Sequence, residues 1–101
     1  MNLPKELEFD IQEEIELEEP KKYKVLLLND DYSTMDFVVE VLMNIFKKTQ
    51  DESMAIMLKV HKNGKAVCGV YVHEIAATKV AQVKTNARKA QFPLKAIIEE
   101  E

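Results

Sequence analysis

The spacing of apolar residues changes between Val25 and Phe46, and this change constrains the fold more than any other feature of the sequence. Residues 25–28 form an uninterrupted apolar run, Val-Leu-Leu-Leu, preceded by lysines. A short run of this kind is typical of a strand that is at least partly covered on both faces. The apolar residues then recur at helical spacing, at Phe37, Val38, Val41, Leu42, Ile45 and Phe46, which predicts a helix over residues 35–47.

Polar residues at both ends support this first helix. Ser33 and Asp36 have the spacing of a capping box, so Ser33 is the predicted N-cap. Lys47 and Lys48 suit the negative end of the helix dipole.

A second helix is predicted to follow almost at once. Thr49 and Glu52 form another capping box, and Asn63-Gly64 is a suitable left-handed C-cap. Because only a few residues join the two helices, we expect a tight helical hairpin.

The rest of the chain predicts a strand, a helix and a strand. Residues 65–72 have strand character, and Gly69 inside them indicates a bulge or the close approach of another group. Residues 73–90 form a helix without a good N-cap, because Val72 stands at that position. The helix is expected to bury Ala76, Val80, Val83 and Ala87 and to expose Lys79, Arg88 and Lys89. Residues 94–100 form a last short strand.

The predicted fold class is therefore α+β, in the order β-α-α-β-α-β. Helices on one face of a small sheet are the economical way to cover it. We expect a small antiparallel three-stranded sheet with three helices on one face.

Charge divides the chain into two parts. Residues 1–20 hold eight acids and one lysine, a net charge of −7, whereas residues 21–101 carry +3. Like charges repel, and few residues of the first part can build a core, so we predict a flexible acidic extension over residues 1–20 and a core domain over residues 21–101.

Cysteine content and hydropathy indicate the compartment. Cys68 is the only cysteine and cannot form an internal disulfide, which favours a reducing compartment. No stretch approaches the roughly 18 apolar residues of a membrane span, and the N-terminus lacks the pattern of a secretory signal. The expected location is the cytoplasm, with no membrane partner.

Three functional classes are weakly supported. Cys68 with His61 or His73 has the residue types of a nucleophile and base, but Cys68 lies in a predicted strand, where a buried structural thiol is commoner. Asp30 and Asp31 have no second ligand pair, so we expect no metal, and there is no phosphate-binding loop that would indicate another cofactor. The basic residues are scattered, which argues against nucleic acid.

The end of the first strand suggests another use. Asn29, Asp30 and Asp31 offer oxygen acceptors beside an adaptable apolar side chain, Met35. Acceptor oxygens next to an apolar side chain suit the N-terminus of a peptide, where an ammonium group is followed by a large apolar side chain. Met57 and His61 share one face of the second helix and would extend this pocket. The alternative is that the polar residues cap a turn, the methionines fill the core and His61 lies at the core's edge.

Three stretches resemble one known family. They are N-D-D-Y-S-T-M-D-F-V, A-I-M-L-K-V-H-K-N-G-K-A-V-C-G-V-Y and E-I-A-A-T-K-V, and in order and spacing they are similar to the ClpS family over about residues 22–100. ClpS proteins are adaptors of the bacterial ATP-dependent Clp protease. The resemblance implies a non-enzymatic protein that binds N-degrons, which have a free α-amino group and Leu, Phe, Tyr or Trp as first residue, and delivers them to the protease.

The resemblance also implies roles for particular residues. The α-amino group would be bound by Asn29, Asp30 and His61. The hydrophobic pocket and its gate would be formed by Asp31, Ser33, Met35, Val38, Met57 and Val60, with Met35 as the gate against β-branched first residues. Thr34 departs from the proline of many members, and Val72 and His73 depart from a common small or hydroxyl pair.

The implied protein partners are a Clp ATPase and N-degron substrates. Glu74 and Lys79 match the surface that docks on the N-terminal domain of a ClpA- or ClpC-type ATPase, and the adaptor is expected to be a monomer. One alternative is a ribosomal-stalk-like interaction domain, which shares the order of elements but has no reason to gather Asn29, Asp30 and His61.

Overall fold

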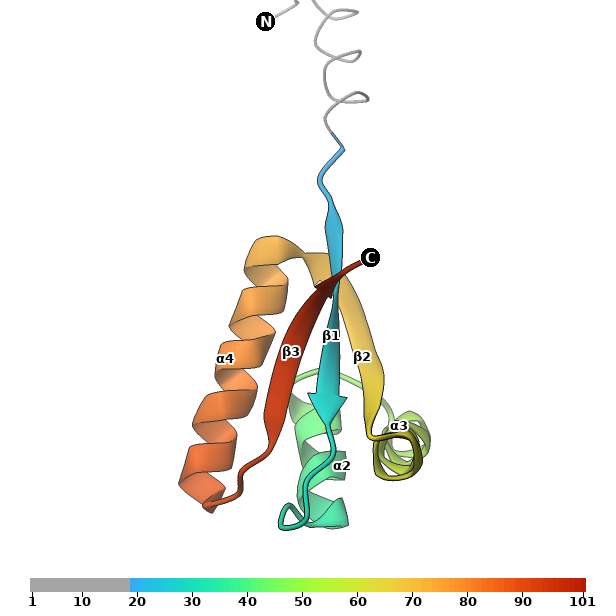
Figure 1. Ribbon diagram of the computed structural model, residues 1–101, viewed down its shortest axis with the longest axis vertical. Helices are drawn as coiled ribbons and strands as arrows, with labels where there is room; N and C mark the ends of the chain where they lie inside the picture. Colours follow the sequence, from blue (N-terminus) through green and yellow to red (C-terminus); the bar gives the residue numbers. More distant parts are fainter. Residues whose placement is uncertain (1–18) are drawn as a thin grey trace, which may run out of the picture.

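The computed structural model describes residues 19–101, which contain three strands and three helices (Figure 1). In chain order they are β1 (Lys22–Leu28), α2 (Met35–Asn44), α3 (Gln50–Asn63), β2 (Lys65–Val72), α4 (His73–Ala90) and β3 (Lys95–Glu100). The predicted order and the α+β class are confirmed. The predicted acidic extension lies almost entirely outside the described residues.

The sheet is antiparallel, with β1 between β2 and β3 (Figure 1). Leu26 pairs with Val67 on one side and with Ile97 on the other. The pairing with β2 shifts between Val25 and Leu26, so that Cys68 is an extra residue and the predicted bulge next to Gly69 is present. The Tyr71 ring lies against Gly69, where an added Cβ would be 2.7 Å from its Cε2 atom.

One face of the sheet carries the main core. Val25 and Leu27 alternate toward this face and are fully buried in one cluster with residues of all three helices. Val41 and Leu42 of α2, Met57 and Val60 of α3, and Ala76, Val83 and Ala87 of α4 belong to this cluster. The predicted placement of the helices on one face is confirmed.

The start of α2 corrects the sequence prediction. The N-cap is Thr34, whose Oγ1 accepts a hydrogen bond from the Phe37 backbone N–H at 3.1 Å. Ser33 lies one residue too early, because its own backbone N–H is donated to Asp30 in the preceding turn. The predicted Ser33–Asp36 capping box is therefore wrong.

The end of α2 also differs from the prediction. The helix stops at Asn44 instead of Lys47, and Lys47 adopts a left-handed backbone with φ of 56°. No basic residue lies in the last turn. A cation from another helix is there instead, since Lys79 Nζ of α4 donates to the Ile45 carbonyl oxygen at 2.7 Å. Lys79 is accordingly half-buried, and its predicted full exposure is wrong.

The termini of the other helices follow the sequence. Thr49 and Glu52 form both hydrogen bonds of the predicted capping box, and Gly64 ends α3 with φ of 85°. Val72 gives α4 no side-chain cap, as predicted. The His73 ring packs edge-on against Tyr23, with ring centroids 5.0 Å apart, and this contact fixes the start of α4 against β1.

Candidate binding site at the end of strand β1

A carboxylate organises the loop that leaves β1. Asp30 Oδ1 accepts two backbone hydrogen bonds, from Tyr32 N at 2.8 Å and from Ser33 N at 2.7 Å. A side chain that accepts from the backbone a few residues later folds the chain into a tight turn. The turn leads directly into the Thr34 cap, so Asp30 lies beside the N-terminal end of α2.

Hydrogen-bond donors of the turn stabilise the negative charge of the Asp30 carboxylate. Partial burial is the largest single influence and raises the pKa of the Asp30 carboxyl, but the Ser33 N–H, the Ser33 hydroxyl and the Tyr32 N–H together outweigh it, and the pKa lies below its ordinary value. The Ser33 hydroxyl acts in the same direction, although its geometry is not that of a hydrogen bond. Asp30 is therefore a carboxylate at neutral pH.

Two oxygen atoms at this loop are buried without a hydrogen-bond partner among the described residues. They are Asp30 Oδ2 and Ser33 Oγ. Buried polar atoms are normally paired, so these two oxygens are acceptors whose donors the described residues do not supply. A cation with N–H donors meets this need better than a neutral group does.

The C-terminal end of α3 lies next to the same loop. Asn29 N donates to the Gly64 carbonyl oxygen at 2.8 Å, which ties the end of β1 to the C-cap of α3. His61 is in the last turn of α3 and is exposed. The structure thus brings the helix end that carries His61 to the loop that carries Asn29 and Asp30 (Figure 1).

The predicted apolar residues divide into buried and exposed ones. Val38, Met57 and Val60 are 7%, 4% and 3% exposed and belong to the core cluster, so they offer a ligand only the edge of the core. Met35, the first residue of α2, is 50% exposed, and Tyr32 is 76% exposed. Met35 therefore lies at the surface at the start of α2, in the helix that the Asp30 turn leads into.

One residue that positions the site, Gly64, is not among the predicted site residues. The sequence predicts Gly64 only as a helix cap, yet its carbonyl oxygen also accepts a hydrogen bond from Asn29 N. The signal was present, because Asn63-Gly64 leads straight into β2, the neighbour of β1. A C-cap next to the central strand places its free carbonyl groups near that strand's end.

The predicted docking residues lie on α4 but in different environments. Glu74 is exposed in the first turn of this helix, where a carboxylate suits the helix dipole. Lys79 points to the end of α2, and its ammonium lies 5.8 Å from the centre of the Tyr71 ring.

The burial of Cys68 argues against a role for it as a catalytic nucleophile. Cys68 is 1% exposed, and burial raises the pKa of its thiol to about 12, so it is not a thiolate nucleophile at neutral pH. Within residues 19–101, no three His, Cys, Asp or Glu side chains gather as metal ligands would. In the same part of the chain, no helix has both the length and the apolar content that crossing a bilayer requires.

Comparison with known proteins places these features in a family. Residues 18–97 match the family model described as ATP-dependent Clp protease adaptor protein ClpS. The chain is 59% identical over 95 residues to the ATP-dependent Clp protease adapter protein ClpS of Wolinella succinogenes, covering 94% of this chain and 93% of that one. It is 54% identical to the ClpS of Oleidesulfovibrio alaskensis, with 90% and 88% of the two chains covered.

A solved structure agrees with the fold. Agrobacterium tumefaciens ClpS2 bound to L-phenylalaninamide superposes with a TM-score of 0.79 at 40% identity, covering 81% of this chain and 99% of that one. The order of elements and the three-stranded antiparallel sheet are shared with this neighbour. The chain therefore belongs to the ClpS family, whose members are adaptors of the ATP-dependent Clp protease and are not enzymes.

Proposed function

We propose that this adaptor binds the free N-terminus of proteins whose first residue is Leu, Phe, Tyr or Trp and delivers them to a Clp ATPase. The observation that carries the proposal is the unpaired Oδ2 of a charged, partly buried Asp30, next to the unpaired hydroxyl oxygen of Ser33. An α-ammonium group supplies both charge and N–H donors to such acceptors.

The remaining parts of the site fit the same ligand. Asn29 and His61 lie on the two chain segments joined by the Asn29–Gly64 hydrogen bond, where they would add acceptors for the ammonium. The edge of the core at Val38, Met57 and Val60 would receive the first side chain, and exposed Met35 would lie over it. Asp31 is exposed beside them and would add negative charge.

The solved neighbour supports this ligand class. Agrobacterium tumefaciens ClpS2 was solved with L-phenylalaninamide, a compound that combines a free α-amino group with a phenylalanine side chain. These are the two chemical features that the loop of Asp30 and the nearby apolar edge would recognise here.

A simple energy balance shows that such a site can supply enough free energy to bind a peptide N-terminus. Burying a large apolar side chain contributes roughly 1.5–3 kcal/mol, and each hydrogen bond to a charged group adds about 1.5–3 kcal/mol. After the cost of association, micromolar affinity, or about −8 kcal/mol, is within reach. An adaptor must also release its substrate, so this range suits delivery.

Delivery requires contact with the ATPase, and we assign this contact to α4. Exposed Glu74 is available to the N-terminal domain of the ATPase, and Lys79 retains N–H donors beyond the one used on Ile45. We further propose that the adaptor acts as a monomer in the cytoplasm and that residues 1–20 assist the transfer.

The experiment is a binding titration with peptides that differ only in the first residue, each with a free and an acetylated amine. Binding is expected for free Leu, Phe, Tyr and Trp termini and is expected to be lost on acetylation, which removes the cation. Asp30→Ala is expected to weaken binding at least about tenfold, or roughly 1.4 kcal/mol. Equal binding of free and acetylated peptides would refute the proposal. For Asp30→Ala, circular dichroism checks that the fold is unchanged.

A further inference from the structure

Helix α2 lies between α3 and α4 and is packed more closely on the side of α3 (Figure 1). Val41 and Leu42 of α2 share one buried cluster with Met57 and Val60 of α3, so the α3 side is filled. On the side of α4, two grooves of about 420 Å³ and 380 Å³ are lined by residues of α2, its C-cap Ile45 and α4. α2 therefore has more room to move toward α4 than toward α3.

A hydrogen bond spans the gap between α2 and α4. Lys79 Nζ of α4 donates to the Ile45 carbonyl oxygen at 2.7 Å, beside the groove that Ile45 and Thr78 line. The Lys79 side chain is half-buried, and its ammonium lies 5.8 Å from the centre of the Tyr71 ring, which gives it a second contact. Hydrogen bonds from a charged donor are stronger than those between neutral groups. This bond therefore fixes the distance between the two helices at the C-terminal end of α2.

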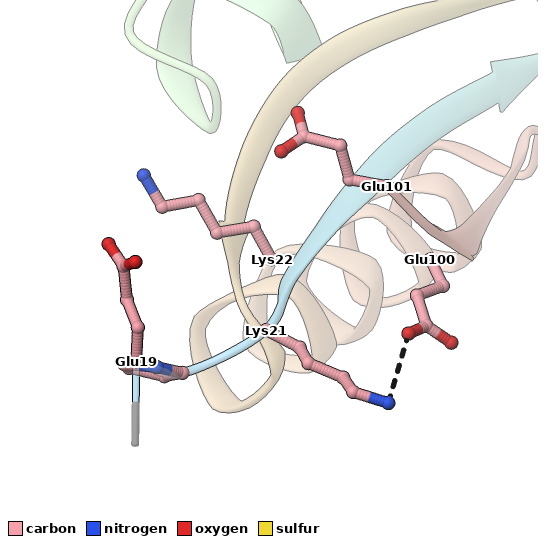
Figure 2. A pocket seen from close by; sticks show the side chains of 6 residues that line it. Glu19, Lys21, Lys22, Glu100 and Glu101 are labelled. Atoms are coloured by element: carbon pink, nitrogen blue, oxygen red, sulfur yellow. Dashed lines mark ion pairs between the residues drawn. The ribbon is translucent and has the colours of Figure 1, made fainter. Parts of the chain in front are cut away.

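Another lysine of the domain provides a contrast. Figure 2 shows Lys21 turned toward Glu100, with its Nζ 3.2 Å from Oε1, beside the start of β1 and the end of β3. The two side chains are 74% and 57% exposed, so water competes for both charges and the ion pair constrains the chain little. Lys79 differs because its ammonium is partly shielded from water and its acceptor belongs to the main chain.

The other end of α2 belongs to the proposed peptide site. Asp30 holds the turn before the helix, Thr34 caps it and Met35 is its first residue. Because α2 and α3 are joined near Ile45, the proposed pocket between Val38 and α3 lies toward the open end of this helical hairpin. α2 has ten residues and is about 15 Å long, so a small tilt about its Ile45 end moves Met35 and Val38 relative to α3.

We propose that Lys79 is a positioning residue of the peptide site, which holds α2 at a set distance from α4 and thereby sets the width of the pocket between α2 and α3. When the lysine side chain is removed, α2 relaxes toward α4, because the open grooves are on that side. The pocket then widens and favours Trp over Leu as the first residue of the peptide. This inference rests on the proposed function, and it gives Lys79 a role in selectivity beside its proposed contact with the ATPase.

The test measures the affinity of the full-length chain for peptides that begin with Leu or with Trp, each with a free amine. In Lys79→Ala, the affinity for the Trp peptide relative to the Leu peptide is expected to rise at least about threefold. Lys79→Gln keeps N–H donors on a shorter side chain, which draws α2 toward α4, and is expected to shift this ratio in the same direction. Lys79→Arg keeps a long cationic donor and is expected to stay near the wild-type ratio.

Two control variants each remove a lysine that does not contact α2. Lys21→Ala breaks the exposed pair with Glu100, and Lys84→Ala truncates an exposed lysine of α4. Both are expected to keep the wild-type ratio. A second measurement needs no peptide, because the backbone amide shifts of Met35 and Val38 in nuclear magnetic resonance spectra report the position of α2. These shifts are expected to change in Lys79→Ala and in neither control.

The outcomes separate this inference from the proposed function. If a folded Lys79→Ala weakens both peptides alike, with the ratio unchanged, Lys79 only stabilises the fold and the inference is wrong. A ratio that shifts toward Leu, or one that Lys79→Arg does not restore, also contradicts it. If Lys79→Ala does not fold, Lys79→Gln decides in the same way. Equal binding of free and acetylated peptides by the wild type would instead reject the proposed function, and the amide shifts of the free protein would still test the position of α2.

Discussion

Lys79 Nζ lies 2.7 Å from the carbonyl oxygen of Ile45, 34 residues earlier in the chain. This carbonyl belongs to the C-terminal end of α2, where backbone acceptors have no partner inside the helix. The ammonium therefore joins α4 to α2 and supplies the positive charge that the last turn of α2 lacks.

Removing this cation is expected to destabilise the fold. Lys79→Ala leaves the Ile45 carbonyl without its charged donor, so the free energy of unfolding is expected to fall by about 1–2 kcal/mol. Urea denaturation followed by circular dichroism measures the change. Lys84→Ala on the exposed side of α4 is the control and is expected to change stability by less than about 0.5 kcal/mol. An equal loss of unfolding free energy in both variants would contradict a stabilising role for the hydrogen bond between Lys79 and Ile45.

Ser33 and Thr34 are expected to respond in opposite ways to replacement by alanine. Thr34→Ala removes the N-cap of α2 and is expected to lower stability by about 1 kcal/mol. Ser33→Ala removes a buried hydroxyl oxygen that has no hydrogen-bond partner among the described residues, so stability is expected to be almost unchanged. Peptide affinity is expected to fall more for Ser33→Ala. Thermal unfolding and a peptide titration measure the two effects, and the reverse pattern would restore Ser33 as the cap.

Met35→Ala is expected to widen the range of accepted first residues. The side chain is half exposed at the start of α2, so its loss costs little core packing. If Met35 excludes branching at Cβ, peptides beginning with Ile or Val are expected to gain affinity, while those beginning with Leu or Phe keep theirs. Met43→Ala, which truncates another exposed methionine of α2, is the control. Unchanged discrimination would assign the gate to another residue.

The contribution of Asp30 to stability is expected to depend on pH in one direction. Its folded pKa lies below the ordinary value of 3.8, so the folded state binds a proton less readily than the unfolded chain. The stability difference between the wild type and Asp30→Ala is therefore expected to be constant above about pH 5 and to shrink as the pH falls below about 4. Urea unfolding at several pH values measures it. A difference that grows on acidification would contradict the charged turn.

Much of the fold was predictable because its signals are local. The apolar run at residues 25–28, the Thr49–Glu52 capping box and Gly64 each act through neighbours in the chain, and each is confirmed. The bulge near Gly69 is confirmed for the same reason. The family was identifiable from three short motifs, and the comparisons confirm it.

The errors occur where a distant residue or a competing turn decides the outcome. The sequence predicted Ser33 as the cap, but Asp30 accepts the Ser33 N–H in the preceding turn, and Thr34 caps α2 instead. Lys47 and Lys48 were the nearest cations to the end of α2, yet Lys79 took that position from another helix.

The sequence alone determined the order of elements, the helix caps set by neighbouring residues and the chemical types available at the end of β1, because these depend on residues close together in the chain. Only the tertiary structure decided that Asn29 bonds to Gly64, that Asp30 keeps an unpaired oxygen and that Lys79 serves α2 instead of lying exposed. Such relationships depend on how strands and helices pack, and packing depends on the whole core at once.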